Sequence, residues 1–236
     1  MNTQDYIFYQ LFEDQSCTYT YWIADAQTLE AALIDPVLEK IDRDLQLAKE
    51  LNLNLVYVLD THIHADHITA AGAIRKRLNI KTGVSRNAAV DCVDIPLEDG
   101  QELSLGRKKI RVLATPGHTD TCLTYSFEDM LFTGDTLLIR GCGRTDFQQG
   151  SSDKLFESVR GKLFQFPDST RVYPGHDYRG FTSSTIGEEK RHNARLNESI
   201  GRDEFRKIMS ELKLAHPKKI AEAVPANMAC GNLNQG

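Results

Sequence analysis

The pattern of apolar and polar positions along the chain predicts short strands interspersed with helices. Apolar runs of strand length occupy residues 20–24, 31–35, 55–59, 110–114, 123–127, 130–132 and 171–173. Apolar residues recur at helical spacing in residues 36–51, 70–78 and 151–164, and in residues 188–214 as two helices broken near Ile200 and Gly201. Pro36 fits the first position of the first helix, and Asp35 fits its N-cap. Strands that come first in pairs and then alternate with helices favour two sheets with helices outside, although the pattern alone leaves one doubly wound parallel sheet open.

Length and charge fit an ordinary globular α/β protein. The chain has 236 residues, and its 28 Lys+Arg against 33 Asp+Glu give a net charge of −5. A mildly acidic chain has no general reason to bind nucleic acid or an anionic membrane, so we expect neither partner. We see no repeat and no Pro/Gly/Ser-rich linker, which predicts a single domain over residues 1–236. The start of the chain does not read as a secretory signal and no apolar run reaches bilayer length, so we expect a cytoplasmic location.

The cysteines are odd in number and irregular in spacing. They are Cys17, Cys92, Cys122, Cys142 and Cys230. No CxxC pair is present, and we therefore expect reduced thiols in a cytosolic protein. Cys142 lies between two glycines, where it is either a small packing residue or a reactive thiol, and we favour packing.

A cluster of metal-ligand residues follows the strand predicted at residues 55–59. Residues 61–67 read Thr-His-Ile-His-Ala-Asp-His, which brings together His62, His64, Asp66 and His67. Imidazole and carboxylate groups bind borderline and first-row metals. On a regular strand, Asp66 and His67 would point to opposite faces, so the segment must be a loop if these side chains are to converge.

Three further ligand-type residues each follow a predicted strand and a glycine. His118 lies in Thr-Pro-Gly-His-Thr, Asp135 in Phe-Thr-Gly-Asp-Thr, and His176 in Tyr-Pro-Gly-His-Asp. Glycine lets the chain turn sharply and brings the backbone near a site. A lone His or Asp is most often a surface or capping residue. Four strands that are each followed by metal-ligand residues are not expected by chance.

This constellation resembles the metallo-β-lactamase superfamily from about Tyr21 to about Arg195. The motifs HxHxDH, PGH, GD and GH stand in the family's order. The resemblance implies an αββα sandwich, with two mixed β-sheets flanked by helices and a site at one edge. It also implies a short helical C-terminal region from about residue 186. It does not by itself imply one activity, because the superfamily hosts many.

Two families within the superfamily are similar to this chain around the Gly-Asp-Thr of residues 134–136. One is glyoxalase II, a two-metal thiolester hydrolase, and the other is the persulfide dioxygenase family. Residues 140–151, Arg-Gly-Cys-Gly-Arg-Thr-Asp-Phe-Gln-Gln-Gly-Ser, resemble the second family almost throughout, as do residues 61–69 and 186–193. The resemblance implies a sulfur dioxygenase that oxidises glutathione persulfide with O2 to sulfite and glutathione. It further implies a mononuclear non-heme Fe(2+), one per chain, and a homodimer.

By this resemblance the iron ligands are His62, His118 and Asp135. Two histidines and one carboxylate form the facial triad of non-heme Fe(II) oxygenases, which leaves about three positions open for the persulfide sulfur and O2. The remaining candidates, His64, Asp66, His67 and His176, would orient ligands and handle protons. In a hydrolase they would hold a second metal, so the sequence does not determine how many metal ions the protein binds. A glyoxalase II-type hydroxyacylglutathione hydrolase therefore stays as the alternative, and a non-enzymatic metal- or sulfane-sulfur-binding protein is a third reading.

Glutathione carries two carboxylates, which an arginine matches with two parallel hydrogen bonds. Arg144, nine residues after Asp135, is the first candidate, and Tyr178 and Arg179 just after His176 come next. Arg191 is a weaker candidate. The competing interpretation for each arginine is a solvated surface charge.

Overall fold

The computed structural model describes residues 5–215 and 219–231. The chain divides into two compact units. Of the described residues, the first unit comprises 5–97, 102–110 and 219–231, and the second unit comprises 98–101 and 111–215. The single domain expected over residues 1–236 stays a prediction.

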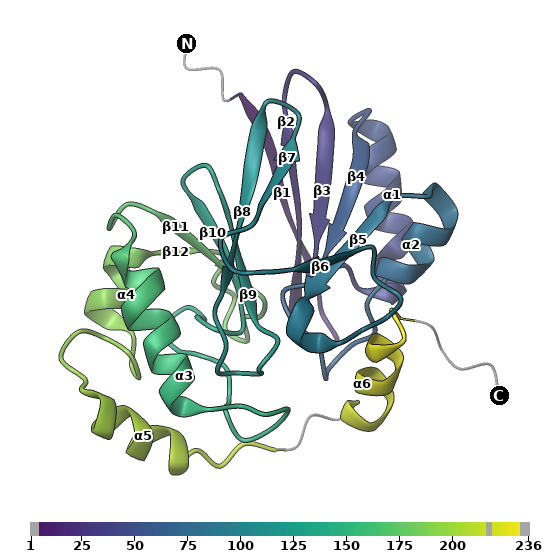
Figure 1. Ribbon diagram of the computed structural model, residues 1–236. Helices are drawn as coiled ribbons and strands as arrows, with labels where there is room; N and C mark the ends of the chain where they lie inside the picture. The colour runs from purple at the N-terminus through teal and green to yellow at the C-terminus, as the bar shows by residue number, and fades with distance from the viewer. Residues whose placement is uncertain (1–4, 216–218, 232–236) are drawn as a thin grey trace. The chain divides into compact units, whose positions relative to one another are not determined.

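The strands form two six-stranded sheets (Figure 1). The first has the order β1-β2-β3-β4-β5-β6, with bounds β1 Tyr6–Glu13, β2 Thr18–Asp25, β3 Glu30–Ile34, β4 Asn54–Leu59, β5 Lys81–Ser85 and β6 Ile95–Leu97. The second has the order β12-β11-β10-β9-β8-β7, with bounds β7 Glu102–Leu105, β8 Lys108–Ala114, β9 Leu123–Phe127, β10 Met130–Gly134, β11 Arg171–Pro174 and β12 Ser184–Thr185. Both sheets combine parallel and antiparallel pairs, so the expectation of two mixed sheets is confirmed.

Helices accompany the strands in both units. The first unit contains α1 (Ile41–Glu50), α2 (Ala71–Leu78) and α6 (Ile220–Met228). The second contains α3 (Ser152–Glu157), which continues as the π-helix Ser158–Lys162, then α4 (Ile186–His192) and α5 (Arg202–Ser210). Within the part of the chain that the structure describes, no helix has the length and apolar character required to cross a membrane.

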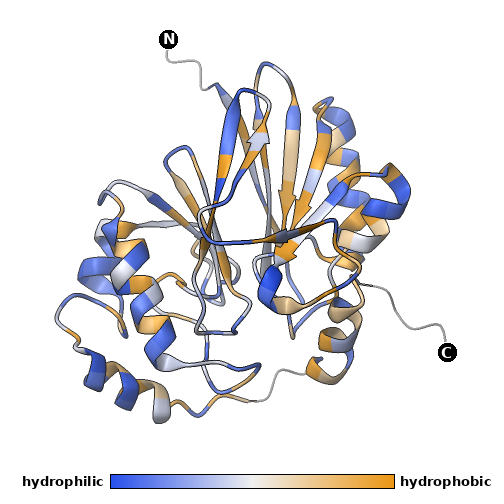
Figure 2. Ribbon diagram, in the orientation of Figure 1, coloured by the Kyte–Doolittle hydropathy of each residue, from blue (hydrophilic) through white to orange (hydrophobic). Residues whose placement is uncertain are grey.

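In the first unit, α1 and α2 pack against β2, β3 and β4. Ile41 and Ile74 lie in one apolar cluster with Leu33 and Val58 of the sheet. β3 and β4 are largely hydrophobic whereas α1 carries many hydrophilic residues (Figure 2). This distribution is the one expected of helices that bury one stripe and expose the other.

In the second unit, α3 and α5 cover residues of β8, β10 and β11. Leu155 and Phe205 share a cluster with Leu131 and Val172 of the sheet. The Phe205 ring also contacts the Phe156 ring, with centroids 5.7 Å apart. Two helices, α4 and α5, lie in the region of residues 188–214 as predicted. The break between them is longer than expected, because α4 ends at His192, and only its end before Arg202 agrees with the position predicted near Gly201.

Two pairs of parallel strands determine which loops become neighbours. In the first sheet Ile34 at the end of β3 is in register with Leu59 at the end of β4. In the second sheet Gly134 at the end of β10 is in register with Pro174 at the end of β11. Because parallel strands end at the same sheet edge, the residues that follow each pair lie side by side.

The helix expected to begin at Pro36 begins later. α1 starts at Ile41, after a 3₁₀ turn over Leu38–Lys40. Asp35 has a positive φ of 50° and is not an N-cap, because its carboxylate accepts hydrogen bonds from Thr61 instead. The N-cap expectation was therefore wrong. The Asp35 side chain, which the local sequence predicted to cap a helix, instead accepts hydrogen bonds from Thr61 just after the end of the neighbouring strand. α6 had no counterpart in the sequence-based interpretation.

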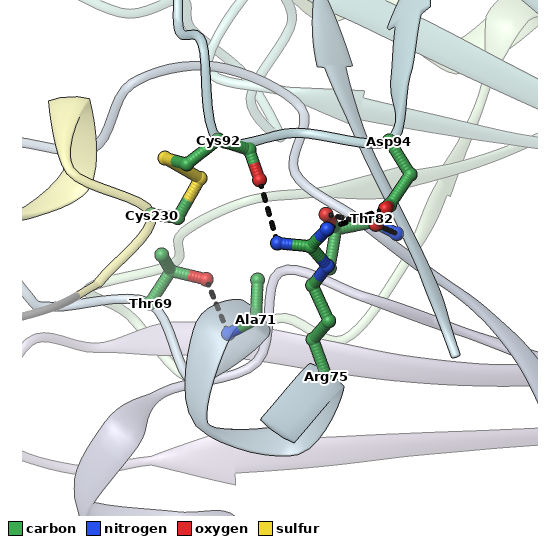
Figure 3. The surroundings of a disulfide bond; sticks show 7 residues. All are labelled: Thr69, Ala71, Arg75, Thr82, Cys92, Asp94 and Cys230. Atoms are coloured by element: carbon green, nitrogen blue, oxygen red, sulfur yellow. Dashed lines mark hydrogen bonds and ion pairs between the residues drawn. A yellow bond between two sulfur atoms is a disulfide. The ribbon is translucent and has the colours of Figure 1, made fainter. Parts of the chain in front are cut away.

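A disulfide joins Cys92 to Cys230 (Figure 3). This finding corrects the expectation of five reduced thiols, whereas Cys17, Cys122 and Cys142 are thiols as expected. The Arg75 guanidinium of α2 donates to the Cys92 carbonyl at 3.0 Å (Figure 3). The spacing of 138 residues carried no sequence signal, because only the folded chain brings the two cysteines together.

Loss of this disulfide should destabilise the protein. A cross-link that closes a loop of 138 residues removes entropy from the unfolded chain, and we expect Cys92→Ser to lower the free energy of unfolding by about 2–4 kcal/mol. Urea denaturation with and without dithiothreitol measures the effect. The reductant should shift the wild-type midpoint and leave that of Cys92→Ser unchanged, and an unshifted wild type would contradict the prediction.

Candidate metal centre

The loop after β4 is anchored at its first residues by Asp35. One Asp35 carboxylate oxygen accepts the Thr61 backbone N–H at 2.6 Å, and the other accepts the Thr61 hydroxyl at 2.8 Å. The same carboxylate lies 3.1 Å from His64 Nε2. Asp35 reaches these groups because it follows β3, the parallel neighbour of β4. The ligand-type loop therefore starts from a fixed, buried anchor.

The three imidazoles of this loop lie against one another. The ring centroids of His62 and His64 are 4.1 Å apart, and those of His64 and His67 are 4.3 Å apart. All three side chains are buried. The Thr61 hydroxyl lies 3.0 Å from His62 Nδ1 and fixes the orientation of that ring. The loop conformation that the sequence required is present.

Asp66 completes a group of donors with the last two histidines. Its Oδ2 lies 2.9 Å from His67 Nδ1 and accepts a hydrogen bond from the Thr18 hydroxyl at 3.2 Å. Donor atoms of His64, Asp66 and His67 all lie within 4.8 Å of one another, close enough to hold a metal ion. The first unit thus contains its own cluster of metal-ligand residues.

Burial and neighbouring charges change the acidity of two groups beside this loop. Burial raises the pKa of Asp60 to about 7, although nearby His64 opposes the rise. For His64 burial alone would lower the pKa, but the Asp35 carboxylate outweighs it and raises the pKa to about 9. Asp60 also accepts a hydrogen bond from the Thr69 hydroxyl at 2.9 Å. The charged His64 ring and the Asp35 carboxylate therefore form a buried ion pair, and such pairing is strong away from solvent.

In the second unit, Asp135 and His176 are brought together by the parallel pair β10 and β11. Asp135 follows the end of β10, and His176 follows the end of β11. His176 Nδ1 lies 2.6 Å from Asp135 Oδ1. A histidine that holds one carboxylate oxygen orients the other oxygen toward a ligand.

His118 lies in the turn between β8 and β9 and faces the same aspartate. Its Nδ1 donates to the Arg144 carbonyl at 2.7 Å, so in the neutral ring the lone pair is on Nε2. Nε2 lies 3.7 Å from Asp135 Oδ2. Two donors each about 2.1 Å from a shared ion lie at most about 4.2 Å apart, so His118 and Asp135 fit one metal.

Gly143 allows His118 and Asp135 to approach this closely. A Cβ at position 143 would lie 2.5 Å from the Asp135 carbonyl oxygen and 2.8 Å from the His118 ring. The Gly143 N–H donates to the Asp135 carbonyl at 2.7 Å. Any larger residue would displace one of the two ligand candidates. This explains why a glycine follows Cys142 in the sequence.

The segments 140–151 and 186–193, singled out by their sequence, contact each other. Glu189 of α4 accepts hydrogen bonds from the Arg140 backbone N–H at 2.8 Å and from its guanidinium at 2.5 Å. Asn193 donates to the Gly141 carbonyl at 3.0 Å and to Glu189 at 2.8 Å. α4 therefore holds the segment that supplies Gly143 and the Arg144 carbonyl.

The Arg144 guanidinium already has partners within the second unit. Its guanidinium donates to both carboxylate oxygens of Asp146, at 2.7 and 2.8 Å, and to the Ala215 carbonyl at 2.7 Å. It also lies over the Phe147 ring, 4.4 Å from the centroid. A substrate carboxylate would have to take the place of Asp146.

The other three candidates for substrate binding are all exposed but have different partners. Tyr178 is 69% exposed, and its ring lies parallel to that of His176 with centroids 6.1 Å apart. Arg179 donates to the Ile139 carbonyl and lies over the Phe181 ring. Arg191, on α4, is exposed and lies 3.8 Å from Asp168. Tyr178 is thus the candidate that the structure places against a ligand-type side chain.

Cys142 is enclosed in the apolar cluster of the second unit. Its sulfur contacts the sulfur of Met209 at 3.8 Å, and Arg195 donates to its carbonyl at 2.7 Å. Burial raises the pKa of the Cys142 thiol to about 11. A buried thiol with a raised pKa is a poor nucleophile, which favours the packing interpretation.

Alkylation should separate the packing and reactive interpretations of Cys142. With a pKa of about 11, only about one Cys142 in a thousand is a thiolate at pH 8. We expect iodoacetamide to modify the partly exposed Cys17 of the folded protein and to spare Cys142, as read by mass spectrometry of peptides. Urea should make both react equally, and equal labelling of the folded protein would refute the packing role.

Sequence reasoning missed three polar residues that support the loop of residues 61–67. They are Asp35, Asp60 and Asn227. Asp35 carries the same signal as Asp135, an acid directly after an apolar strand, and could have been found by it. Asn227 lies in α6, far away along the chain, and carries no such signal.

Known proteins similar to this chain match it over nearly its whole length. Residues 18–176 match the family model described as Metallo-beta-lactamase superfamily. The human protein named "Persulfide dioxygenase ETHE1, mitochondrial" is 50% identical over 225 residues, covering 94% of this chain and 87% of its own length. The crystal structure of ETHE1 from Myxococcus xanthus superposes with a TM-score of 0.93 at 53% identity, covering 96% of this chain and 100% of that one. "Glyoxylase B2" of Dictyostelium discoideum is 30% identical, covering 94% of this chain and 89% of its own length.

Proposed function

Because the chain belongs to the persulfide dioxygenase family of the metallo-β-lactamase superfamily, we propose that it oxidises glutathione persulfide with O2 to sulfite and glutathione. Glutathione persulfide, O2 and water give glutathione, sulfite and two protons. The terminal sulfur loses electrons and O2 gains them. The observation that carries the proposal is the 50% identity to the human persulfide dioxygenase over 94% of the chain.

We propose one iron per chain, held by His62 of the first unit and by His118 and Asp135 of the second. The support within the second unit is the 3.7 Å between His118 Nε2 and Asp135 Oδ2. The support within the first unit is the buried His62 ring beside the Thr61 hydroxyl. Fe(II) in such a facial triad supplies the redox chemistry that O2 needs.

Residues around these ligands orient them and hold protons. His176 donates to Asp135, and the Arg144 carbonyl sets the tautomer of His118. His64 and His67 are not iron ligands in this proposal, and Asp35 and Asp66 orient their rings in the same way. Such contacts raise ligand basicity and reduce the freedom of each ring before substrate arrives.

A hydrolase is the second candidate, because the chain contains enough donors for two metals. His64, Asp66 and His67 lie within metal-binding range of one another. The Dictyostelium discoideum relative is named "Glyoxylase B2". A hydroxyacylglutathione hydrolase of this kind would hold two metals and work without O2.

Anaerobic purification and iron analysis provide the test. We expect about one iron per chain, O2 uptake with glutathione persulfide, and no turnover of S-lactoylglutathione. Asp135→Ala should abolish iron binding and O2 uptake together, because it removes a charged ligand. Glu128→Ala, a change at an exposed turn residue, is the matched control and should leave both unchanged. No O2 uptake by an iron-loaded sample would exclude the dioxygenase, and two metals with anaerobic hydrolysis would support the hydrolase.

Glutathione recognition by Arg144 can be tested with two variants of opposite effect. Arg144→Gln removes a charge-assisted pair with a substrate carboxylate, and we expect KM to rise about 10-fold or more with kcat little changed. Asp146→Asn removes the competing carboxylate and should lower KM. If Arg144 only holds Asp146, both variants will leave KM unchanged.

Tyr178, Arg179 and Arg191 complete the proposed surface for the tripeptide. Replacement of Tyr178, which is 69% exposed, tests this part of the proposal, with KM in the O2-uptake assay as the measurement. The homodimer and the cytoplasmic location also stay proposals, to be addressed by light scattering and by fractionation. The human relative is named as mitochondrial.

A further inference from the structure

One side chain of α6 makes three hydrogen bonds to the loop that carries the histidines. The Asn227 amide nitrogen donates to the carbonyl oxygens of His64 and His67, each at 2.9 Å. Its amide oxygen accepts the Thr69 backbone N–H, also at 2.9 Å. Asn227 is buried, and its three partners lie about 160 residues away along the chain.

The backbone around Asn227 lies directly against the end of the same loop. A Cβ at Gly72 would lie 2.1 Å from the Cys230 carbonyl oxygen, and a Cβ at Gly231 would lie 2.2 Å from the Thr69 carbonyl oxygen. Such approaches are possible only without a side chain at both positions. Ala223 and Ala226 of α6 pack on Ile68. The contact is therefore close-packed and specific for small residues.

The disulfide holds this arrangement covalently. Cys230, three residues after Asn227, is bonded to Cys92, and its backbone N–H donates to the Asn227 carbonyl at 3.0 Å. Cys92 in turn is held by Arg75 of α2, the helix that follows the loop (Figure 3). The end of α6 is thus tied to the same part of the first unit as the loop.

We infer that Asn227 is a positioning residue of the metal centre, held in place by the Cys92–Cys230 disulfide. Its two N–H groups determine the direction of the peptide carbonyls at His64 and His67, and so the backbone from which both imidazoles project. The inference rests on the proposed function only in taking this loop as part of the metal site. The proposed iron ligand His62 belongs to the same loop, so Asn227 would change metal affinity through the backbone of that loop, without touching the metal.

Two variants remove different parts of the interaction. Asn227→Asp keeps the shape and the acceptor but has no N–H donors for the His64 and His67 carbonyls. Asn227→Ala also removes the acceptor for Thr69. Met228→Ala is the matched control, because Met228 is the next residue of α6 and its side chain is exposed. Each full-length protein is stripped with a chelator and titrated with Co(II), whose visible absorption reports ligand geometry.

The expected result separates positioning from simple loss of stability. Both Asn227 variants should weaken Co(II) binding about 10- to 100-fold and alter the absorption bands, whereas Met228→Ala should match the wild type. Amide hydrogen exchange of metal-free protein should be faster at Thr69 in Asn227→Ala. Wild-type affinity and unchanged bands in folded Asn227→Asp would overturn the inference.

A second measurement needs no substitution and decides the matter if both variants fail to fold. Dithiothreitol reduces the disulfide of the wild-type chain to two thiols and is itself oxidised to a cyclic disulfide. We expect faster exchange of the Thr69 amide and weaker Co(II) binding after this treatment. Exchange and affinity that are both unaffected by complete reduction would overturn the inference. Thr69 exchange involves neither iron nor persulfide, so absent O2 uptake would refute the proposed function while this result stood on its own.

Discussion

The candidate site depends on one constraint, the parallel pairing of two pairs of strands. β3 and β4 end in register in the first unit, and β10 and β11 end in register in the second. Parallel strands end at one edge, so the loops that follow them are neighbours whatever their separation along the chain. Asp35 therefore meets Thr61 and His64, and Asp135 meets His176. The same rule operates in both units and places a carboxylate beside a histidine each time.

Burial makes these polar contacts necessary for a stable fold. An imidazole or carboxylate taken out of water without a partner is costly, so each ligand-type side chain has to be oriented by something nearby. His118 is oriented by a peptide carbonyl, and His176 and His64 by carboxylates. Rings held by such hydrogen bonds have little freedom to turn away. Binding a metal would therefore cost little further side-chain entropy, because these rings are already restricted.

Small residues and one covalent bond set the distances at which these segments meet. Gly143 lets the Asp135 backbone and the His118 ring approach, while Gly72 and Gly231 let the end of α6 lie on the loop after β4. The Cys92–Cys230 disulfide then ties that end of the chain to the unit whose loop it contacts. A glycine at such a position has no substitute, because the space that a Cβ needs is filled by backbone.

The amino-acid sequence by itself determined the elements whose signal is local. Apolar runs predicted β9 over its full length and the start of α5 just after Gly201. The spacing of His, Asp and Gly after strands identified the metal-ligand candidates. Tertiary structure decided what depends on contacts between distant segments. It directed the Asp35 carboxylate to Thr61 rather than to a helix N-terminus and brought the Ala215 carbonyl to Arg144. It also joined Cys92 to Cys230 and brought Asn227 to the histidine loop. The physical reason is that periodicity and turn chemistry act over a few residues. The bonds named here form only after segments far apart along the chain have packed together within one unit.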